Sequence, residues 1–241
     1  MACEKCMDTG WVETNGFVRK CICQRKVSKE VIKALNIPKR YEDVSLENFL
    51  LLSKEHKKAL SIVKSYIELK AFQKGNGLMF VGPPGTGKTH LAVSIIKEIY
   101  TKYGIKGYFI NTISMLFEVK KLYEERKSEN SLLKEILEVP ILVLDDLGNE
   151  RLSEWSKDII HYIISNRYND MKPIIITSNS YINTQNDLPS LEERLSPSII
   201  SRIKSTCKLV KIKGTDIRSK GKEFLEKVKQ LQKAKREAEE Q

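Results

Sequence analysis

The chain has 241 residues and a mass of 27.7 kDa, enough for one core of roughly 100 to 200 residues and a small appendage. Hydrophobic residues make up 41% and charged residues 30%. No apolar run approaches the roughly 18 residues of a membrane span, so the composition predicts a soluble globular protein and excludes a membrane-spanning one. The formal net charge of +11 at pH 7 favours an acidic partner such as nucleic acid, although a solvated Lys-rich surface gives the same balance.

The amino-terminal segment combines positive charge with cysteine. It has no apolar signal-peptide core, which predicts a cytoplasmic, reducing location. Residues 1–40 hold nine Lys or Arg against four acids, a net of +5. Asn15–Gly16 is a strong signal for a two-residue hairpin turn. Such a hairpin would bring together four of the chain's five cysteines, which are Cys3, Cys6, Cys21 and Cys23.

Four converging thiolates in a reducing compartment favour a tetrahedral, structural Zn²⁺ site, because so short a module has too little core to fold unaided. A disulfide framework is disfavoured by the compartment, and a thioredoxin-like CxxC motif needs a βαβ pattern that is absent here. Unliganded thiols remain the other alternative. The fifth cysteine, Cys207, lies in an alternating apolar stretch and is predicted to be a core residue.

Two amphipathic helices are predicted before the main domain. The first includes Val31 and Leu35 at helical spacing and ends at Pro38. It either packs against the hairpin or docks on a partner. The second is predicted over 54–73 and is closed by residues 75–77, Gly-Asn-Gly.

From residue 78 onward, short apolar strands alternate with helices, which predicts an α/β fold: a five-stranded parallel sheet with helices on both faces. The strands are expected near 78–81, 107–111, 140–145, 173–178 and 206–212, and the helices near 88–102, 112–125, 130–138 and 154–169. The predicted organisation is a zinc module with its helix (1–38), a linker and helix (39–75), the nucleotide-binding domain (76–213) and a charged, helical tail (214–241).

A phosphate-binding loop follows the first strand of this domain. GPPGTGKT fits the pattern G-x-x-x-x-G-K-[ST] at each fixed position and opens a predicted helix. Backbone N–H groups and the helix N-terminus would surround the phosphates of ATP, Lys88 would neutralise the β and γ oxygens, and Thr89 would ligate Mg²⁺. The residues expected around the nucleotide here are Gly82, Pro83, Pro84, Gly85, Thr86, Gly87, Lys88, Thr89 and His90.

Polar residues end the next strands at the edge of the sheet where ligands bind in parallel α/β folds. Asp145 is predicted to complete the magnesium shell and Asp146 to polarise the attacking water. Two acids that are merely exposed at a strand end are the alternative. Asn179 ends the strand IIITSN and is predicted to present its amide to that water or to the γ-phosphate, or else to cap the following loop.

Arg202 lies in SIISRI, at the end of a helical segment that Pro197 is expected to interrupt. From there it could reach the ATP of a neighbouring subunit and stabilise the γ-phosphate in trans. An ordinary surface arginine is the alternative.

Taken together, GPPGTGKT, ILVLDDLG, IIITSN and SIISRI resemble the Walker A, Walker B, sensor I and arginine-finger elements of an AAA+ ATPase. Two further stretches, IPKRYEDVSLENF before the core and GTDIR after it, resemble sequences of the DnaC/DnaI group of helicase loaders. The resemblance to that group spans roughly residues 37–218. The related transposition ATPase IstB shares much of this pattern. Most AAA+ proteins continue into a helical lid, whereas this sequence has only the charged tail after Gly214, so we expect no regular lid domain, with Arg218 in place of the sensor II arginine at the nucleotide.

The resemblance also implies the partners. Zinc-binding amino-terminal modules of DnaI-type loaders contact the replicative DNA helicase, and a helix matching 111–121 lies near single-stranded DNA. In that helix Ile113, Leu116 and Phe117 are expected to pack, and Lys120 and Lys121 to meet phosphates or simply to face solvent. We therefore predict a cytoplasmic ATPase that forms an ATP-dependent homo-oligomer and loads the helicase onto single-stranded DNA. The alternatives are an IstB-like transposition helper and a zinc adaptor with a structural nucleotide.

Overall fold

The computed structural model describes most of the residues of the chain. They are 9, 11–14, 17–20, 29–124, 130–148, 153–182, 190–214, 216–219 and 230. Two predictions fall outside them: the cysteine cluster of Cys3, Cys6, Cys21 and Cys23, and the helix of the charged tail. Within the described ranges, no group of three or more His, Cys, Asp or Glu side chains could hold a metal ion.

The predicted amino-terminal hairpin is present. Strands β1 (Trp11–Thr14) and β2 (Phe17–Lys20) pair antiparallel, with Thr14 opposite Phe17. This register leaves two residues between the strands, as a two-residue hairpin turn requires.

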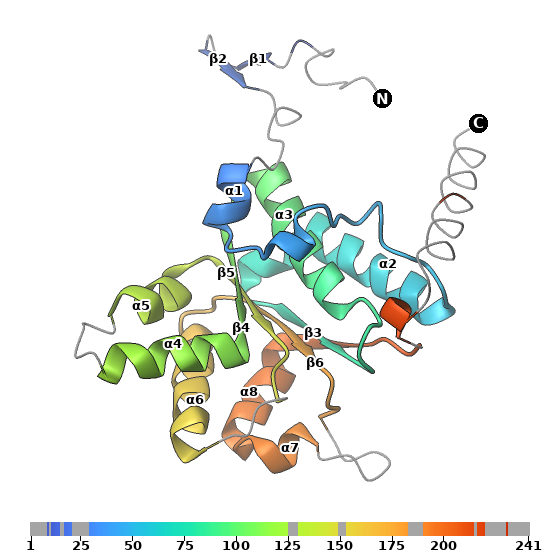
Figure 1. Cartoon of the computed structure of the whole chain (residues 1–241). Helices are drawn as coiled ribbons and strands as arrows, with labels where there is room; N and C mark the ends of the chain where they lie inside the picture. The colour runs from blue at the N-terminus through green and yellow to red at the C-terminus, as the bar shows by residue number, and fades with distance from the viewer. Residues whose placement is uncertain are drawn as a thin grey trace.

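The main domain is built on a five-stranded parallel sheet, as predicted (Figure 1). Its strands, in chain order, are β3 (Gly77–Val81), β4 (Gly107–Asn111), β5 (Ile141–Asp145), β6 (Ile174–Ser178) and β7 (Cys207–Lys211). Their spatial order is β4-β5-β6-β3-β7, and each neighbouring pair is parallel. The polar residues that follow β3, β5 and β6 therefore meet at one edge of the sheet.

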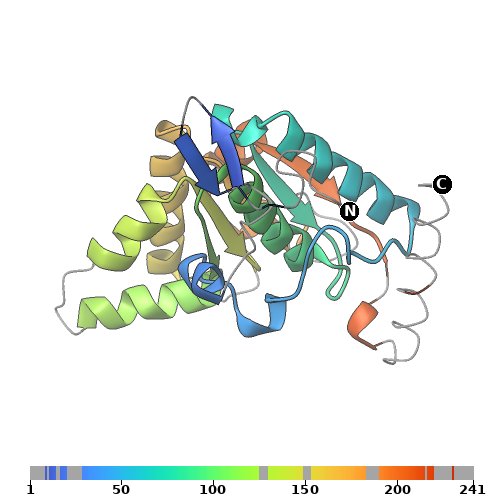
Figure 2. The same ribbon diagram turned by 90° about the horizontal axis from the view of Figure 1, so that it is seen from above.

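Helices cover both faces of the sheet (Figures 1 and 2). Alternate strand residues face opposite sides: Leu78 and Phe80 join one buried cluster, and Met79 and Val81 join the other. The first cluster is completed by α1 (Lys29–Ala34), α2 (Lys54–Glu68) and α3 (Lys88–Tyr103), and the second by α4 (Thr112–Glu124), α5 (Asn130–Glu138), α6 (Glu154–Asn169), α7 (Leu191–Arg194) and α8 (Pro197–Thr206). The short 3-10 helices are η2 (Lys39–Tyr41), η3 (Ala71–Lys74) and η4 (Ile217–Ser219).

Helix α1 packs on the main domain. Leu35 is fully buried and Ile37 nearly so, in the cluster that lies beneath α3. The backbone N–H of Phe109 donates to the Leu35 carbonyl at 2.9 Å, and the Asn36 amide donates to the Phe109 carbonyl at 2.9 Å. These contacts tie the end of α1 to strand β4, and we propose on this ground a domain boundary before Lys29, where the sequence predicted one after Pro38.

Two helix ends differ from the prediction. Helix α2 ends at Glu68 instead of continuing to residue 73, because Lys70 adopts a left-handed conformation (φ 50°) that breaks the helical path. Pro197 begins α8 instead of interrupting a helix. The Ser196 hydroxyl accepts from the N–H of Ile199, and proline is favoured at the first helical position because its missing N–H would have no partner there.

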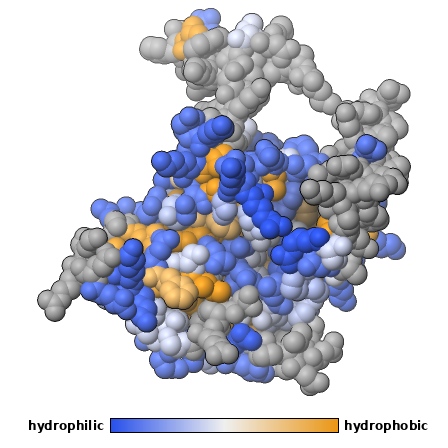
Figure 3. All heavy atoms as spheres, in the orientation of Figure 1, coloured by the Kyte–Doolittle hydropathy of each residue, from blue (hydrophilic) through white to orange (hydrophobic). Residues whose placement is uncertain are grey.

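Hydrophilic side chains cover most of the face seen in Figure 3, and hydrophobic ones are exposed near α4. Of the helices in the described part of the chain, none is long and apolar enough to cross a bilayer.

Candidate nucleotide-binding site

The loop between β3 and α3 forms one wall of a cavity of about 320 Å³. Gly85 and Gly87 have φ values of 73° and 88°, a left-handed region in which glycine carries no steric penalty. A Cβ on Gly87 would lie 2.7 Å from the ring of Phe49. The loop therefore needs glycine both for its own path and for the close approach of the segment that carries Phe49.

Lys88 is the first residue of α3 and is only 6% exposed. Its Nζ donates to the carbonyls of Gly82 and Pro83, at 2.8 Å each. Burial lowers the pKa of Lys88 to about 8, and the nearby charges of Asp146 and Asp145 oppose that shift. The ammonium group of Lys88 is thus held within its own loop, and a polyphosphate bound there would supply the negative charge that stabilises its protonated form.

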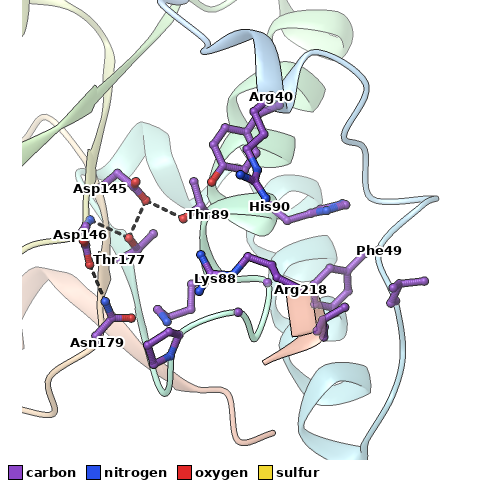
Figure 4. A pocket seen from close by; sticks show the side chains of 16 residues that line it. Arg40, Phe49, Lys88, Thr89, His90, Asp145, Asp146, Thr177, Asn179 and Arg218 are labelled. Carbon is purple, nitrogen blue, oxygen red and sulfur yellow. Dashed lines mark hydrogen bonds between the residues drawn. The ribbon is translucent and has the colours of Figure 1, made fainter. Parts of the chain in front are cut away.

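Asp145 ends β5 and lies opposite Thr89 (Figure 4). Its Oδ1 accepts from Thr89 Oγ1 at 2.8 Å and from Thr177 Oγ1 at 2.7 Å. Burial raises the pKa of Asp145, and the hydrogen bonds from Thr177 and Thr89 counter that shift. A hydroxyl and a carboxylate at this separation are oxygen ligands of the kind that Mg²⁺ prefers, so Thr89 and Asp145 fit the magnesium site expected from the sequence.

Asp146 and Asn179 are also brought together. Asn179 Nδ2 donates to Asp146 Oδ1 at 2.7 Å, and the backbone N–H of Asp146 donates to Thr177 Oγ1 at 2.9 Å. Asp146 has φ 59°, which is unusual for a residue with a side chain and occurs often at functional sites. Asp146, Asn179, Lys88 and Thr89 all line the same cavity.

The far end of the cavity is lined by a segment that the sequence did not indicate as part of the site. Arg40, Tyr41, Phe49 and Leu50 contribute to the lining there. They belong to residues 39–50, which cross α3 and which we call the strap (Figure 4).

Two side chains of α3 hold the strap in place. Lys97 Nζ donates to the carbonyls of Glu42 and Val44, at 2.6 and 2.7 Å. The ring of His90 lies 2.8 Å from the Ser45 carbonyl and 5.4 Å from the ring of Phe49. His90, which the sequence placed among the nucleotide residues, thus lines the cavity and also anchors its wall.

Arg218 lies at the same end of the cavity as Phe49 (Figure 4). It lies in η4, next to Ile217, which also lines the cavity. Its guanidinium pairs with Asp216. Arg218 was expected near the nucleotide from the sequence, whereas Ile217 and Asp216 were not.

Arg202 lies away from this cavity. It sits in the middle of α8, where its Nη1 donates to the Ser198 carbonyl at 3.2 Å and its guanidinium lies 5.7 Å from the ring centre of Tyr168. The structure therefore brings the other predicted catalytic residues together and leaves Arg202 outside the site of its own chain.

Several residues of the site were not predicted from the sequence. Thr177 stands in IIITSN beside the predicted Asn179, and its place at the carboxyl end of a buried strand could have identified it. Tyr41 and Phe49 gave no such signal, because the strap has no periodicity and is placed by contacts with α3, with His56 of α2 and with Phe109 of β4.

Known proteins share this fold and loop. Residues 20–224 match the family model described as IstB-like ATP binding protein. An insertion sequence IS5376 putative ATP-binding protein of Geobacillus stearothermophilus is 27% identical over 164 residues, which cover 68% of this chain and 64% of that protein. The replicative helicase loader DnaC of Escherichia coli is 28% identical over 177 residues, which cover 70% of this chain and 71% of DnaC.

Among solved structures, a crystal structure of the DnaC helicase loader is similar with a TM-score of 0.67 and 40% identity, covering 73% of this chain and 99% of that one. The chain thus spans the whole of that solved domain but only about two thirds of the length of the two curated relatives. The family model covers most of the chain and includes the loop, the strap and Arg218. The chain belongs to the IstB-like ATP-binding family, with an AAA+ P-loop fold.

Proposed function

We propose that this chain is an ATPase that loads a replicative DNA helicase onto single-stranded DNA. The observation that carries the proposal is the single cavity in which Lys88, the Thr89–Asp145 pair and the Asp146–Asn179 pair meet. Support for the helicase comes from the 40% identity to a DnaC helicase loader across 99% of that solved chain.

Each polar group has a role in hydrolysis on this proposal. Lys88 and the N–H groups of the loop hold the β- and γ-phosphates. Thr89 and Asp145 hold Mg²⁺, which neutralises developing charge on the phosphate oxygens when it is bound. Asp146 orients a water for attack on the γ-phosphorus, and that attack breaks the bond to the β-phosphate oxygen and releases ADP and phosphate. Asn179 fixes the carboxylate of Asp146 through their 2.7 Å hydrogen bond.

The strap gives the site a place for the base. Tyr41 and Leu50 are half-buried and present apolar surface at the end of the cavity away from Asp146, and Arg40 lines the same end, whereas Phe49 is only 1% exposed. Aromatic rings and a guanidinium are suitable surfaces for a planar heterocycle. We assign this end to adenine.

Helix α4 supports a contact with single-stranded DNA. Phe117 was expected to pack, but its side chain is 70% exposed, because Met115, Leu116 and Val119 already fill the buried face of the helix. Lys120 and Lys121 are exposed on the same helix. An exposed aromatic ring beside lysines is the combination with which proteins stack bases and hold the backbone of single strands.

The amino-terminal module is assigned to the helicase contact. Its hairpin is present in the structure, and the Zn²⁺ site at Cys3, Cys6, Cys21 and Cys23 stays a prediction from the sequence. We propose that the metal holds the hairpin ends together and that the module binds the helicase.

The proposal is tested by mixing the full chain with candidate hexameric helicases and, separately, with transposases, with ATP and Mg²⁺, and measuring complex masses. We expect a helicase complex and turnover that responds to single-stranded DNA. A transposase complex instead would favour the IstB-type role, which the 27% identity to the IS5376 protein supports. Nucleotide that binds but is never hydrolysed, even with a partner present, would favour a zinc adaptor with a structural nucleotide.

A further inference from the structure

The segment after β7 lies directly on the phosphate-binding loop. The backbone N–H of Ile217 donates to the Gly85 carbonyl at 3.0 Å. The carboxylate of Asp216 occupies the space beside the Gly85 Cα, so that any Cβ at Gly85 would overlap it. An acidic side chain therefore touches the loop whose function is to receive a polyanion.

Asp216 holds Arg218 in a two-pronged ion pair. Arg218 Nε donates to Asp216 Oδ1 at 3.0 Å and Nη2 donates to Oδ2 at 3.2 Å, while the Arg218 backbone N–H donates to Oδ1 at 2.9 Å. The side chains of Arg218 and Asp216 are 56% and 39% exposed. An exposed pair is weak, so a stronger anion can take the guanidinium from it.

Asp216 interacts with two cations beside the loop, Lys88 and Arg218. Arg218 lowers the pKa of Lys88 by repulsion, whereas Asp216 raises it. Hydrogen bonds from Arg218 lower the pKa of Asp216 itself, which keeps the carboxylate ionised. Asp216 thus offsets the repulsion between the two cations, Lys88 and Arg218.

We propose that Asp216 is the counter-ion of Arg218 whenever no nucleotide is bound, and that the phosphates of a bound nucleotide replace it as the partner of Arg218. This inference rests on the proposed nucleotide binding. It makes Asp216 a positioning residue that lowers nucleotide affinity, because the Asp216–Arg218 pair must open before Arg218 can bind phosphate. Through the Ile217–Gly85 hydrogen bond, this exchange also couples occupation of the loop to the position of residues 216–219.

The test is a double-mutant cycle on the full chain, with ATP affinity measured by calorimetry in the presence of Mg²⁺. Asp216→Asn keeps the shape and removes the charge, and we expect it to tighten ATP binding about twofold to fivefold, the range of an exposed ion pair. In an Arg218→Ala background the same substitution should gain little, because the guanidinium that it frees is absent. Adenosine, which has no phosphate, should bind equally to the wild type and to Asp216→Asn.

Asp170→Asn is the matched control, since Asp170 pairs with Lys172 two residues away, as Asp216 does with Arg218, but outside the lining of the cavity. It should leave ATP affinity unchanged. Unchanged or weaker ATP binding by Asp216→Asn, or a full gain without Arg218, would overturn the exchange while the proposed function stands. A wild-type chain that binds no ATP at all would overturn both.

Discussion

At the scale of single residues, the candidate site is held together by hydrogen bonds among its own groups. The ammonium of Lys88 is bound by two carbonyls of its own loop, and Thr89 donates to the carboxylate with which it would share a metal ion. Both sets of hydrogen bonds keep the side chains in place without ligand, so little ordering cost remains when phosphate and Mg²⁺ enter.

Replacing Lys88 tests its role. Lys88→Ala should weaken ATP binding about tenfold to a hundredfold, the effect of losing a charge-assisted hydrogen bond. The surface variant Lys134→Ala, which breaks only the pair with Glu138, is the control. Calorimetry at pH 7 measures both, and equal affinities in the two variants would refute the assignment.

The pH dependence of the wild type provides a separate check on the same residue. Since the pKa of Lys88 is lowered to about 8, the side chain is charged below that pH and loses its proton above it. Phosphate binds the charged form, so ATP affinity should fall as the pH rises from about 8 toward the ordinary lysine value of 10.5. Lys88→Ala should lack this fall, and a flat profile in the wild type would contradict the prediction.

At the scale of elements, the strap depends on α3 for its position. It contains only the short η2 helix (Lys39–Tyr41) and no strand, and Lys97 holds two of its carbonyls. The base end of the cavity is therefore formed by a loop and a helix together, whereas the phosphate end is formed by the P-loop itself.

Lys97→Ala should separate the two ends of the site. Loss of both hydrogen bonds should loosen Tyr41 and Phe49 and weaken ATP binding by about fivefold to tenfold, while tripolyphosphate affinity stays unchanged. Lys102→Ala, on the same helix but paired only with Glu98 at the surface, is the control. An equal loss for ATP and tripolyphosphate would show that Lys97 supports the loop rather than the strap.

A second connection between elements is Arg167, which is fully buried in α6. Its guanidinium donates to five backbone carbonyls at the end of α5 and at the starts of β5 and β6, which are those of Ile136, Leu137, Val139, Pro140 and Pro173. It thus satisfies polar groups that helix and strand ends leave unpaired.

Arg167→Met should lower the free energy of unfolding by about 2 to 4 kcal/mol, because the buried carbonyls lose their donor. Lys172→Met, which removes a less buried donor to the Leu137 carbonyl, should cost under about 1 kcal/mol. Urea denaturation measures both, and similar losses would mean that Arg167 is not the main support of these ends.

At the scale of the whole molecule, the lining of the cavity does not include the predicted arginine finger. Arg202 lies on α8, outside the cavity of its own chain, so it can act on ATP only in another copy. We therefore keep the proposal that hydrolysis depends on assembly.

Arg202→Ala should preserve ATP binding. It should abolish most of the increase in the rate of ATP hydrolysis per chain that assembly at high protein concentration produces, since arginine fingers raise kcat by factors of roughly 10³ or more. Lys204→Ala on the same helix, which breaks only the pair with Glu192, is the control. Turnover measured across protein concentrations separates them, and unchanged turnover in Arg202→Ala would remove the assignment.

The sequence alone determined the sheet, the helices around it and the phosphate loop. Strands β3 to β7 follow from short apolar runs, and GPPGTGKT has one well-defined local geometry between a strand and a helix. Asp145, Asp146 and Asn179 were predictable because parallel strands bring their carboxyl ends to one edge. These features depend on local pattern and on rules that hold for all sheets of this type.

Only the tertiary structure decided the rest. Three contacts join residues that are far apart in the chain: the packing of α1 on β4, the packing of the strap on α3 and the contact of Asp216 with Gly85. The exposure of Phe117 depends on which of its neighbours fill the core. Such contacts leave no periodic trace in a sequence, because each is set by the shape of the space that the other elements leave.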